Sequence, residues 1–100
     1  MRKVLVRYKV KPHRVEENEA LVKAVYAELH EKKTEGLRYA TLKADDGLTF
    51  FHLASIEGEG NPLARTAAFK AFQENIRERC DEPPSPTELS LLGAYGFFDQ

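Results

Sequence analysis

The sequence contains no tryptophan, and cysteine and methionine each occur once among its 100 residues. With Cys80 as the single cysteine, one chain can form neither an internal disulfide nor a cysteine-based metal site. Cys80 is either a small packing residue or a reactive thiol. No histidine stands near it in the sequence to activate it, so the pattern favours packing.

Net charge and long apolar runs are also scarce. The 15 basic and 16 acidic residues are interspersed and leave a formal charge of -1, so no broad field attracts nucleic acid or an anionic membrane. No apolar run approaches the roughly 20 residues that span a bilayer, and the N-terminal charges lead straight into a strand-like segment instead of a signal peptide. We therefore expect a cytoplasmic protein without nucleic-acid or membrane partners.

Hydrophobic residues make up 42% of the chain and charged residues 31%. These fractions are typical of a folded globular protein, and the length predicts one domain over residues 1–100. A domain of this size buries only about two-thirds of the surface that its unfolded chain exposes. Association with a partner subunit would therefore add useful stability.

The first strand is predicted over residues 4–10. Apolar side chains and Tyr8 hold one parity, and charged side chains hold the other. Helical spacing of apolar residues predicts a helix over residues 14–33, which Gly36 ends. Strands over residues 37–44 and 48–56 follow, joined at an Asp-Asp-Gly sequence that favours a tight turn.

The second helix has a strong start signal, with Asn61 as the cap and Pro62 as the first helical residue. We expect it to run to about Asp81, followed by a proline-containing linker over residues 81–86. The apolar segment 89–98 is predicted to form the last strand.

The order of elements is βαββαβ, which is the ferredoxin-like α+β pattern. In that fold a four-stranded antiparallel sheet carries two helices on one face. Leu5, Phe51 and Leu53 have the opposite parity, so the other face is also apolar and needs a cover. A second copy of the sheet is the simplest cover, and we expect a homodimer.

Two stretches of the chain resemble the antibiotic biosynthesis monooxygenase-like domains of the dimeric α/β barrel superfamily. They are Val6-Arg7-Tyr8-Lys9-Val10-Lys11-Pro12 before the first helix, and Thr49-Phe50-Phe51-His52-Leu53-Ala54 followed by Ala68-Phe69-Lys70-Ala71-Phe72. The resemblance extends over nearly the whole length and implies a dimeric α/β barrel. Similar proteins include cofactor-independent monooxygenases, haem-degrading oxygenases and members without known activity.

The chain departs from these relatives at several positions. Many carry a Glu and then a Trp on the third strand, where this sequence has His52 and Ala54. Haem-degrading relatives need an Asn, a Trp and a His, and the matching positions here are Val6, Ala54 and Ala68. The resemblance therefore argues against haem. The three histidines show no metal-ligand spacing, so neither a cofactor nor a metal is expected.

The parity of the third strand and the resemblance place His52 on the helix-covered face, where this family has its pockets. His52 is either a base that takes a proton from a phenol or enol, or a buried neutral histidine bound by a backbone or Tyr partner. Tyr8 is either a general acid or a core residue with its oxygen at the rim. Tyr39 and Tyr95 are weaker candidates, because their faces cannot be assigned.

The resulting hypothesis is a small-molecule-binding homodimer, with cofactor-independent oxidation or isomerisation of a small aromatic or enolisable compound. His52 and Tyr8 are its candidate catalytic residues. The alternative is a non-catalytic ligand-binding, scaffold or stress-related dimeric module. A cavity beside His52 favours the first, and solid packing of His52 by phenylalanines favours the second.

Overall fold

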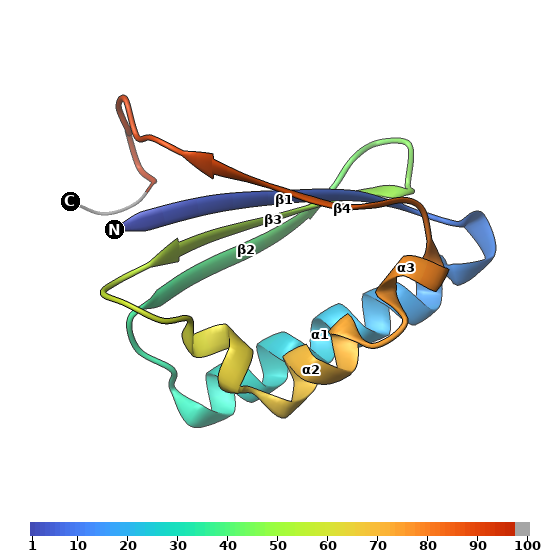
Figure 1. Cartoon of the computed structure of the whole chain (residues 1–100), viewed down its shortest axis with the longest axis horizontal. Coiled ribbons are helices and arrows are strands. Elements are labelled where there is room, and N and C mark those ends of the chain that lie inside the picture. The colour runs from blue at the N-terminus through green and yellow to red at the C-terminus, as the bar shows by residue number, and fades with distance from the viewer. Residues whose placement is uncertain (98–100) are drawn as a thin grey trace.

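The computed structural model describes residues 1–97. A four-stranded antiparallel sheet lies on one side and the helices lie on the other (Figure 1). The elements in chain order are β1 (Arg2–Val10), a 3-10 turn (Pro12–Arg14), α1 (Val15–Lys32), β2 (Leu37–Lys43), β3 (Thr49–Ile56), a second 3-10 turn (Pro62–Arg65), α2 (Ala67–Gln73), α3 (Ile76–Arg79) and β4 (Cys80–Leu89).

The strand order is β2-β3-β1-β4, with all neighbours antiparallel. This order confirms the predicted ferredoxin-like α+β fold. It also confirms that β3 is a central strand. The pairing register sets Val6 opposite His52 and Tyr8 opposite Phe50, so the even-numbered residues of β1 and β3 share the face under the helices.

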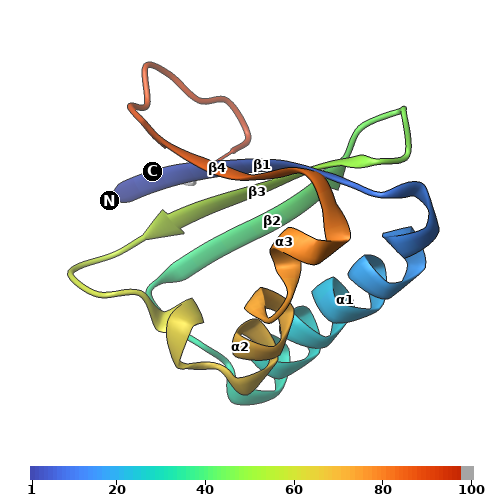
Figure 2. The same ribbon diagram turned by 45° about the vertical axis from the view of Figure 1, so that its right-hand side comes forward.

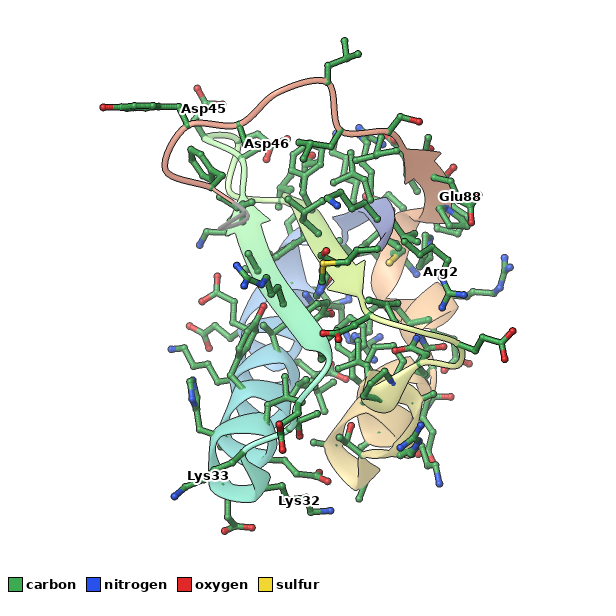
Figure 3. All side chains as sticks on the ribbon, turned by 90° about the vertical axis from the view of Figure 1, so that its left-hand side faces the viewer. Arg2, Lys32, Lys33, Asp45, Asp46 and Glu88 are labelled. Atoms are coloured by element: carbon green, nitrogen blue, oxygen red, sulfur yellow. The ribbon has the colours of Figure 1, made fainter. Side chains whose placement is uncertain are left out.

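The core lies between this face and the helices. Tyr8, Val10 and Phe50 contribute from the sheet, and Val25 and Phe72 contribute from the helices. Figure 2 shows α1 and α2 side by side beneath the sheet. Figure 3 views the two layers from the side, with Lys32 and Lys33 marking the helix layer and Asp45 and Asp46 lying at the sheet.

The region predicted as one second helix is divided into three pieces, so that prediction is wrong in detail. Asn61 caps the 3-10 turn as expected, because its side chain accepts a hydrogen bond from the Leu63 amide at 3.0 Å. Thr66 then adopts an extended conformation and caps α2. Asn75 has a φ of 58° and separates α2 from α3. The left-handed conformation at Asn75 is one that asparagine tolerates better than most residues.

The last strand begins earlier in the chain than the sequence predicts. The predicted linker 81–86 lies inside β4, whereas residues 90–97 of the predicted strand are not in a strand; Phe98 lies outside the described residues. β4 is an edge strand, and an edge strand tolerates proline because one row of its backbone groups has no partner to bond. The Pro-rich sequence is therefore compatible with pairing to β1.

The segment after β4 runs above the sheet on the side away from the helices (Figures 1 and 2). It exposes large apolar side chains, among them Leu92 and Tyr95, which are almost fully exposed. On β2, Leu42 is also more than half exposed. This side of the isolated chain therefore presents apolar surface to water.

Candidate functional site

His52 lies at the centre of a buried hydrogen-bonded cluster on β3. Its Nε2 is 2.6 Å from the hydroxyl of Tyr8 on β1. Its Nδ1 is 2.6 Å from the hydroxyl of Tyr39 and 3.1 Å from Oγ1 of Thr41, both on β2. Three adjacent strands therefore fix the imidazole from both ring nitrogens.

The rings of this cluster also pack against one another. The Tyr8 and His52 rings stack with centroids 5.2 Å apart, and Tyr8 stacks on Phe50 at 5.5 Å. Phe72 of α2 approaches the His52 ring at 5.3 Å. These contacts restrict the orientation of the rings, so the hydrogen-bond geometry is preorganised.

Burial keeps the members of the cluster neutral at pH 7. It lowers the pKa of His52 to about 4, because charging the imidazole would leave it poorly solvated. It also raises the pKa of Tyr8 and of Tyr39 well above 10, and the hydrogen bond from Asn18 opposes this rise at Tyr8. The predicted neutral imidazole at pH 7 agrees with these directions.

A second layer of polar residues supports Tyr8 from the helices. The side-chain amide of Asn18 on α1 donates to the Tyr8 hydroxyl at 3.0 Å, and Nε of Arg79 donates to Asn18 Oδ1 at 3.2 Å. The other Arg79 nitrogens donate to the backbone carbonyls of Phe72 and Glu74. Asn18 and Arg79 are almost completely buried.

A cavity of about 180 Å³ lies between the sheet and the helices, and His52, Tyr8 and Tyr39 line it. Most of its other lining side chains are apolar: Val4, Val6, Ala54, Ile56, Leu63, Phe69, Phe72, Ile76 and Pro84. Arg2, Asn61 and Gln73 are polar members of the lining. The Arg2 guanidinium there donates to the Gly60 carbonyl at 2.8 Å.

The structure brings together the two residues that the sequence singled out, since Tyr8 and His52 are in direct contact. It adds Tyr39, whose sheet face could not be assigned from the sequence and whose hydroxyl contacts His52. Tyr95 is almost fully exposed and follows β4. Cys80 is a buried member of the core, and burial raises the pKa of its thiol. Both observations favour the packing role expected for Cys80.

Asn18 and Arg79 were missed, although the sequence carries a signal for both. Residues 15, 18, 22, 25 and 29 lie on one helical stripe, and residues 69, 72, 76 and 79 lie on another. Asn18 and Arg79 are the polar members of these otherwise apolar stripes. A polar residue in such a position is buried and needs a partner.

The cluster has the chemistry of proton transfer and hydrogen bonding. Within residues 1–97, no group of three or more His, Cys, Asp or Glu side chains is arranged to hold a metal ion. No helix in that part of the chain is long and apolar enough to cross a membrane. The site consists of hydroxyl, imidazole and amide groups beside a mostly apolar cavity, with the Arg79 guanidinium behind Asn18.

Comparison with solved structures shows the same fold in several proteins. A conserved protein from Methanosarcina mazei Go1 matches with a TM-score of 0.73 and 23% identity over 88% of this chain and 89% of its own. An antibiotic biosynthesis monooxygenase matches with a TM-score of 0.67 and 14% identity over 93% of this chain and 100% of its own. A variant of SnoaB, a cofactor-independent oxygenase from Streptomyces nogalater, matches with a TM-score of 0.67 and 12% identity over 95% and 96%.

No family model matches the chain, and no curated protein matches its sequence. The structural likenesses nevertheless extend over nearly the full length of both chains in each pair. The resemblance drawn from the sequence is therefore confirmed at the level of the fold, which is that of the antibiotic biosynthesis monooxygenase-like proteins.

Proposed function

From this shared fold, we propose that the protein is a small-molecule-binding homodimer that removes a proton from an enolisable or phenolic compound. The resulting anion is either oxidised by dioxygen without a cofactor or protonated at another atom. The observation that carries this proposal is the contact of His52 with Tyr8 and Tyr39 beside an apolar cavity. SnoaB, described as a cofactor-independent oxygenase, has the same fold at 12% identity.

The size of the cavity supports a small ligand. An apolar protein cavity of about 150 Å³ is large enough to bind benzene. The cavity beside His52 measures about 180 Å³. It exceeds the benzene-binding cavity by roughly the volume that one water molecule occupies in the liquid. It therefore suits a single six-membered ring with one small substituent better than a fused-ring compound.

His52 and Tyr8 together form the proton-accepting unit in this proposal. A proton transferred to the pair is held by the imidazole. Tyr8 keeps its own proton, because burial keeps the pKa of its phenol above 10. The low pKa of His52 makes it a weak base. An anion formed next to it would stabilise the imidazolium and raise that pKa, so the ion pair can form during the reaction.

The oxidation balances without a further reductant. A CH₂ group next to a carbonyl loses one proton to His52, and the electron pair remains as an enolate. Dioxygen forms a C–O bond to that carbon, and the proton returns to give a hydroperoxide. Cleavage of the O–O bond with loss of the second hydrogen from the same carbon gives a carbonyl and water. Isomerisation needs only the first proton transfer and its return to another atom.

The homodimer would cover the apolar side of the sheet. Leu53 pairs with Leu5 on one side and with Ala40 on the other, and Phe51 pairs with Leu42. This forms one apolar patch on the face away from the helices. Together with the exposed apolar side chains after β4, it is surface that a second sheet would remove from water.

Hydrogen exchange at carbon tests the proton abstraction without knowledge of the natural substrate. Cyclohexanone fits the cavity size, and its uptake of deuterium from D₂O can be followed by mass spectrometry. We expect wild-type protein to accelerate the exchange and His52→Gln to lose on the order of 100-fold of that acceleration. His30→Gln, at an exposed histidine, is the matched control and should retain it.

A second candidate function is ligand binding without turnover. It is favoured by the observation that both ring nitrogens of His52 already have internal partners, as in a structural core histidine. If cyclohexanone binds in the cavity and wild-type protein exchanges its hydrogens no faster than His52→Gln, the binding module is the correct function.

A further inference from the structure

The hydrogen bonds around His52 have a direction that begins at Arg79. A guanidinium has only donors, so its contact with Asn18 must be accepted by the amide oxygen. The amide nitrogen of Asn18 therefore faces Tyr8 and donates to its hydroxyl. Arg79 is 1% exposed and Asn18 is fully buried, so water cannot compete for these contacts.

The same reasoning fixes the hydroxyl hydrogen of Tyr8. Its oxygen receives the hydrogen bond from Asn18, and the acceptor within reach of its own hydrogen is Nε2 of His52 at 2.6 Å. Tyr8 is fully buried, so any other orientation would leave a buried donor without a partner at a considerable cost. Nε2 is therefore the bare nitrogen, and the neutral imidazole carries its hydrogen on Nδ1.

The Nδ1 hydrogen continues the chain to β2. It points to the Tyr39 hydroxyl at 2.6 Å, with Thr41 farther away at 3.1 Å. Tyr39 thus accepts, and its own hydrogen needs another acceptor. Thr41 is the internal alternative, because its hydroxyl interacts with Tyr39 and can accept from it while donating to Tyr26 at 2.8 Å. Tyr39 also lines the cavity, so an acceptor placed there can take its hydrogen in place of Thr41.

We propose that Arg79 and Asn18 are positioning residues that fix this polarity, and that Tyr39 donates a hydrogen bond to the carbonyl oxygen of a small enolisable ketone. The proposal rests on the proposed function, which supplies the proton abstraction. It adds the ligand class and the group that recognises it. Removing a proton next to the carbonyl places negative charge on its oxygen, and a preorganised donor stabilises that charge most in a dry site.

The first test is the tautomer of His52, which nitrogen-15 NMR of the wild-type protein reports directly. We expect Nδ1 to be protonated and Nε2 to be bare at pH 7. Protonation of Nε2 would overturn the proposal, and this measurement requires no variant.

Asn18→Asp tests whether Asn18 sets the direction in which the hydrogen bonds from Tyr8 to His52 are donated. A carboxylate only accepts, so Tyr8 would donate to it and would receive the hydrogen of Nε2 instead. The neighbouring Arg79 compensates the new charge, which helps the variant to fold. We expect the His52 tautomer to switch to Nε2–H. Ala20→Asp adds the same charge at an exposed position of α1 and should leave the tautomer unchanged. An unchanged tautomer in Asn18→Asp, or an equal switch in both variants, contradicts the proposal.

The ligand class is tested by comparing the binding of cyclohexanone and methylenecyclohexane, which replaces the carbonyl oxygen with CH₂. One net hydrogen bond corresponds to about a two- to tenfold preference for cyclohexanone. We expect this preference in the wild type, together with a lowered carbonyl stretching frequency of the bound ketone, and expect both to be lost in Tyr39→Phe. An equal preference in wild type and Tyr39→Phe would overturn the role of Tyr39.

These outcomes separate the inference from the proposed function. If cyclohexanone binds through Tyr39 but its hydrogens do not exchange, the recognition stands and the catalytic role of His52 fails. If hydrogen exchange occurs and Tyr39→Phe neither weakens binding nor slows exchange, the catalytic role stands and the recognition by Tyr39 fails.

Discussion

Burial of His52 predicts a specific dependence of stability on pH. The imidazole has a pKa of about 6.5 when exposed, and burial lowers this to about 4 in the folded protein. The unfolded chain therefore binds a proton at a higher pH than the folded chain does. The contribution of the neutral imidazole is complete above pH 6.5, decreases as the pH falls toward 4, and reaches its limit below that value.

The size of the effect follows from the two pKa values. The full difference corresponds to about 3 kcal/mol of unfolding free energy, and lowering the pH from 7 to 5 removes about 2 kcal/mol of it. With a urea m-value of about 1–3 kcal/mol/M, the unfolding midpoint should fall by roughly 0.7–2 M over this range. Below pH 5 the lowered pKa values of carboxylates such as Asp46 add their own losses, so the informative window lies between pH 5 and 7.

Urea unfolding at a fixed protein concentration, followed by circular dichroism at pH 5, 6 and 7, measures this dependence. The glutamine in His52→Gln cannot be protonated, so this variant should lose most of the decrease in unfolding free energy between pH 7 and pH 5. His13→Gln and His30→Gln replace exposed histidines and should retain it. A His52→Gln variant with the wild-type slope between pH 5 and 7 would refute the argument that a buried neutral imidazole produces it.

Three further predictions concern the core, the sheet face and the cavity. Arg79→Met should lower the unfolding free energy by about 3 kcal/mol or more, because it leaves buried oxygens without donors. The control Arg77→Met, at an exposed position, should change the unfolding free energy by less than about 0.5 kcal/mol. Equal losses in the two variants would contradict this prediction. Wild-type protein should sediment as a dimer at micromolar concentration and Leu53→Asp as a monomer, whereas a monomeric wild type would disprove the homodimer. Ala54→Phe should fill the cavity and abolish cyclohexanone binding with an unchanged circular dichroism spectrum; unimpaired binding would place the ligand elsewhere.

The position of the candidate site could be predicted from the sequence because strand parity is a strong constraint. A residue in a strand points to one of two faces, so the parity of β1 placed Tyr8, and the parity of β3 together with the family resemblance placed His52 on the same face. The face of Tyr39 could not be assigned in the same way. It became clear only from the register of β2 against β3, in which Thr41 lies opposite His52.

The C-terminal part could not be predicted by the same reasoning. The apolar segment 89–98 has the composition of a strand, and the prolines before it have the composition of a linker. Pairing depends on the neighbour that a segment meets, and composition does not report whether a strand lies at an edge. The structure pairs the Pro-rich segment with β1 and leaves residues 90–97 of the apolar one outside the sheet.

The prolines of β4 have a consequence for how this protein meets other chains. Three of the ten residues of this strand are prolines and lack a backbone N–H, and an incoming strand would need such donors to extend the sheet. Edge-to-edge growth, the first step of strand-swapped aggregates, is therefore disfavoured along β4. The same prolines that made this segment difficult to predict as a strand also make it a poor template for a further one.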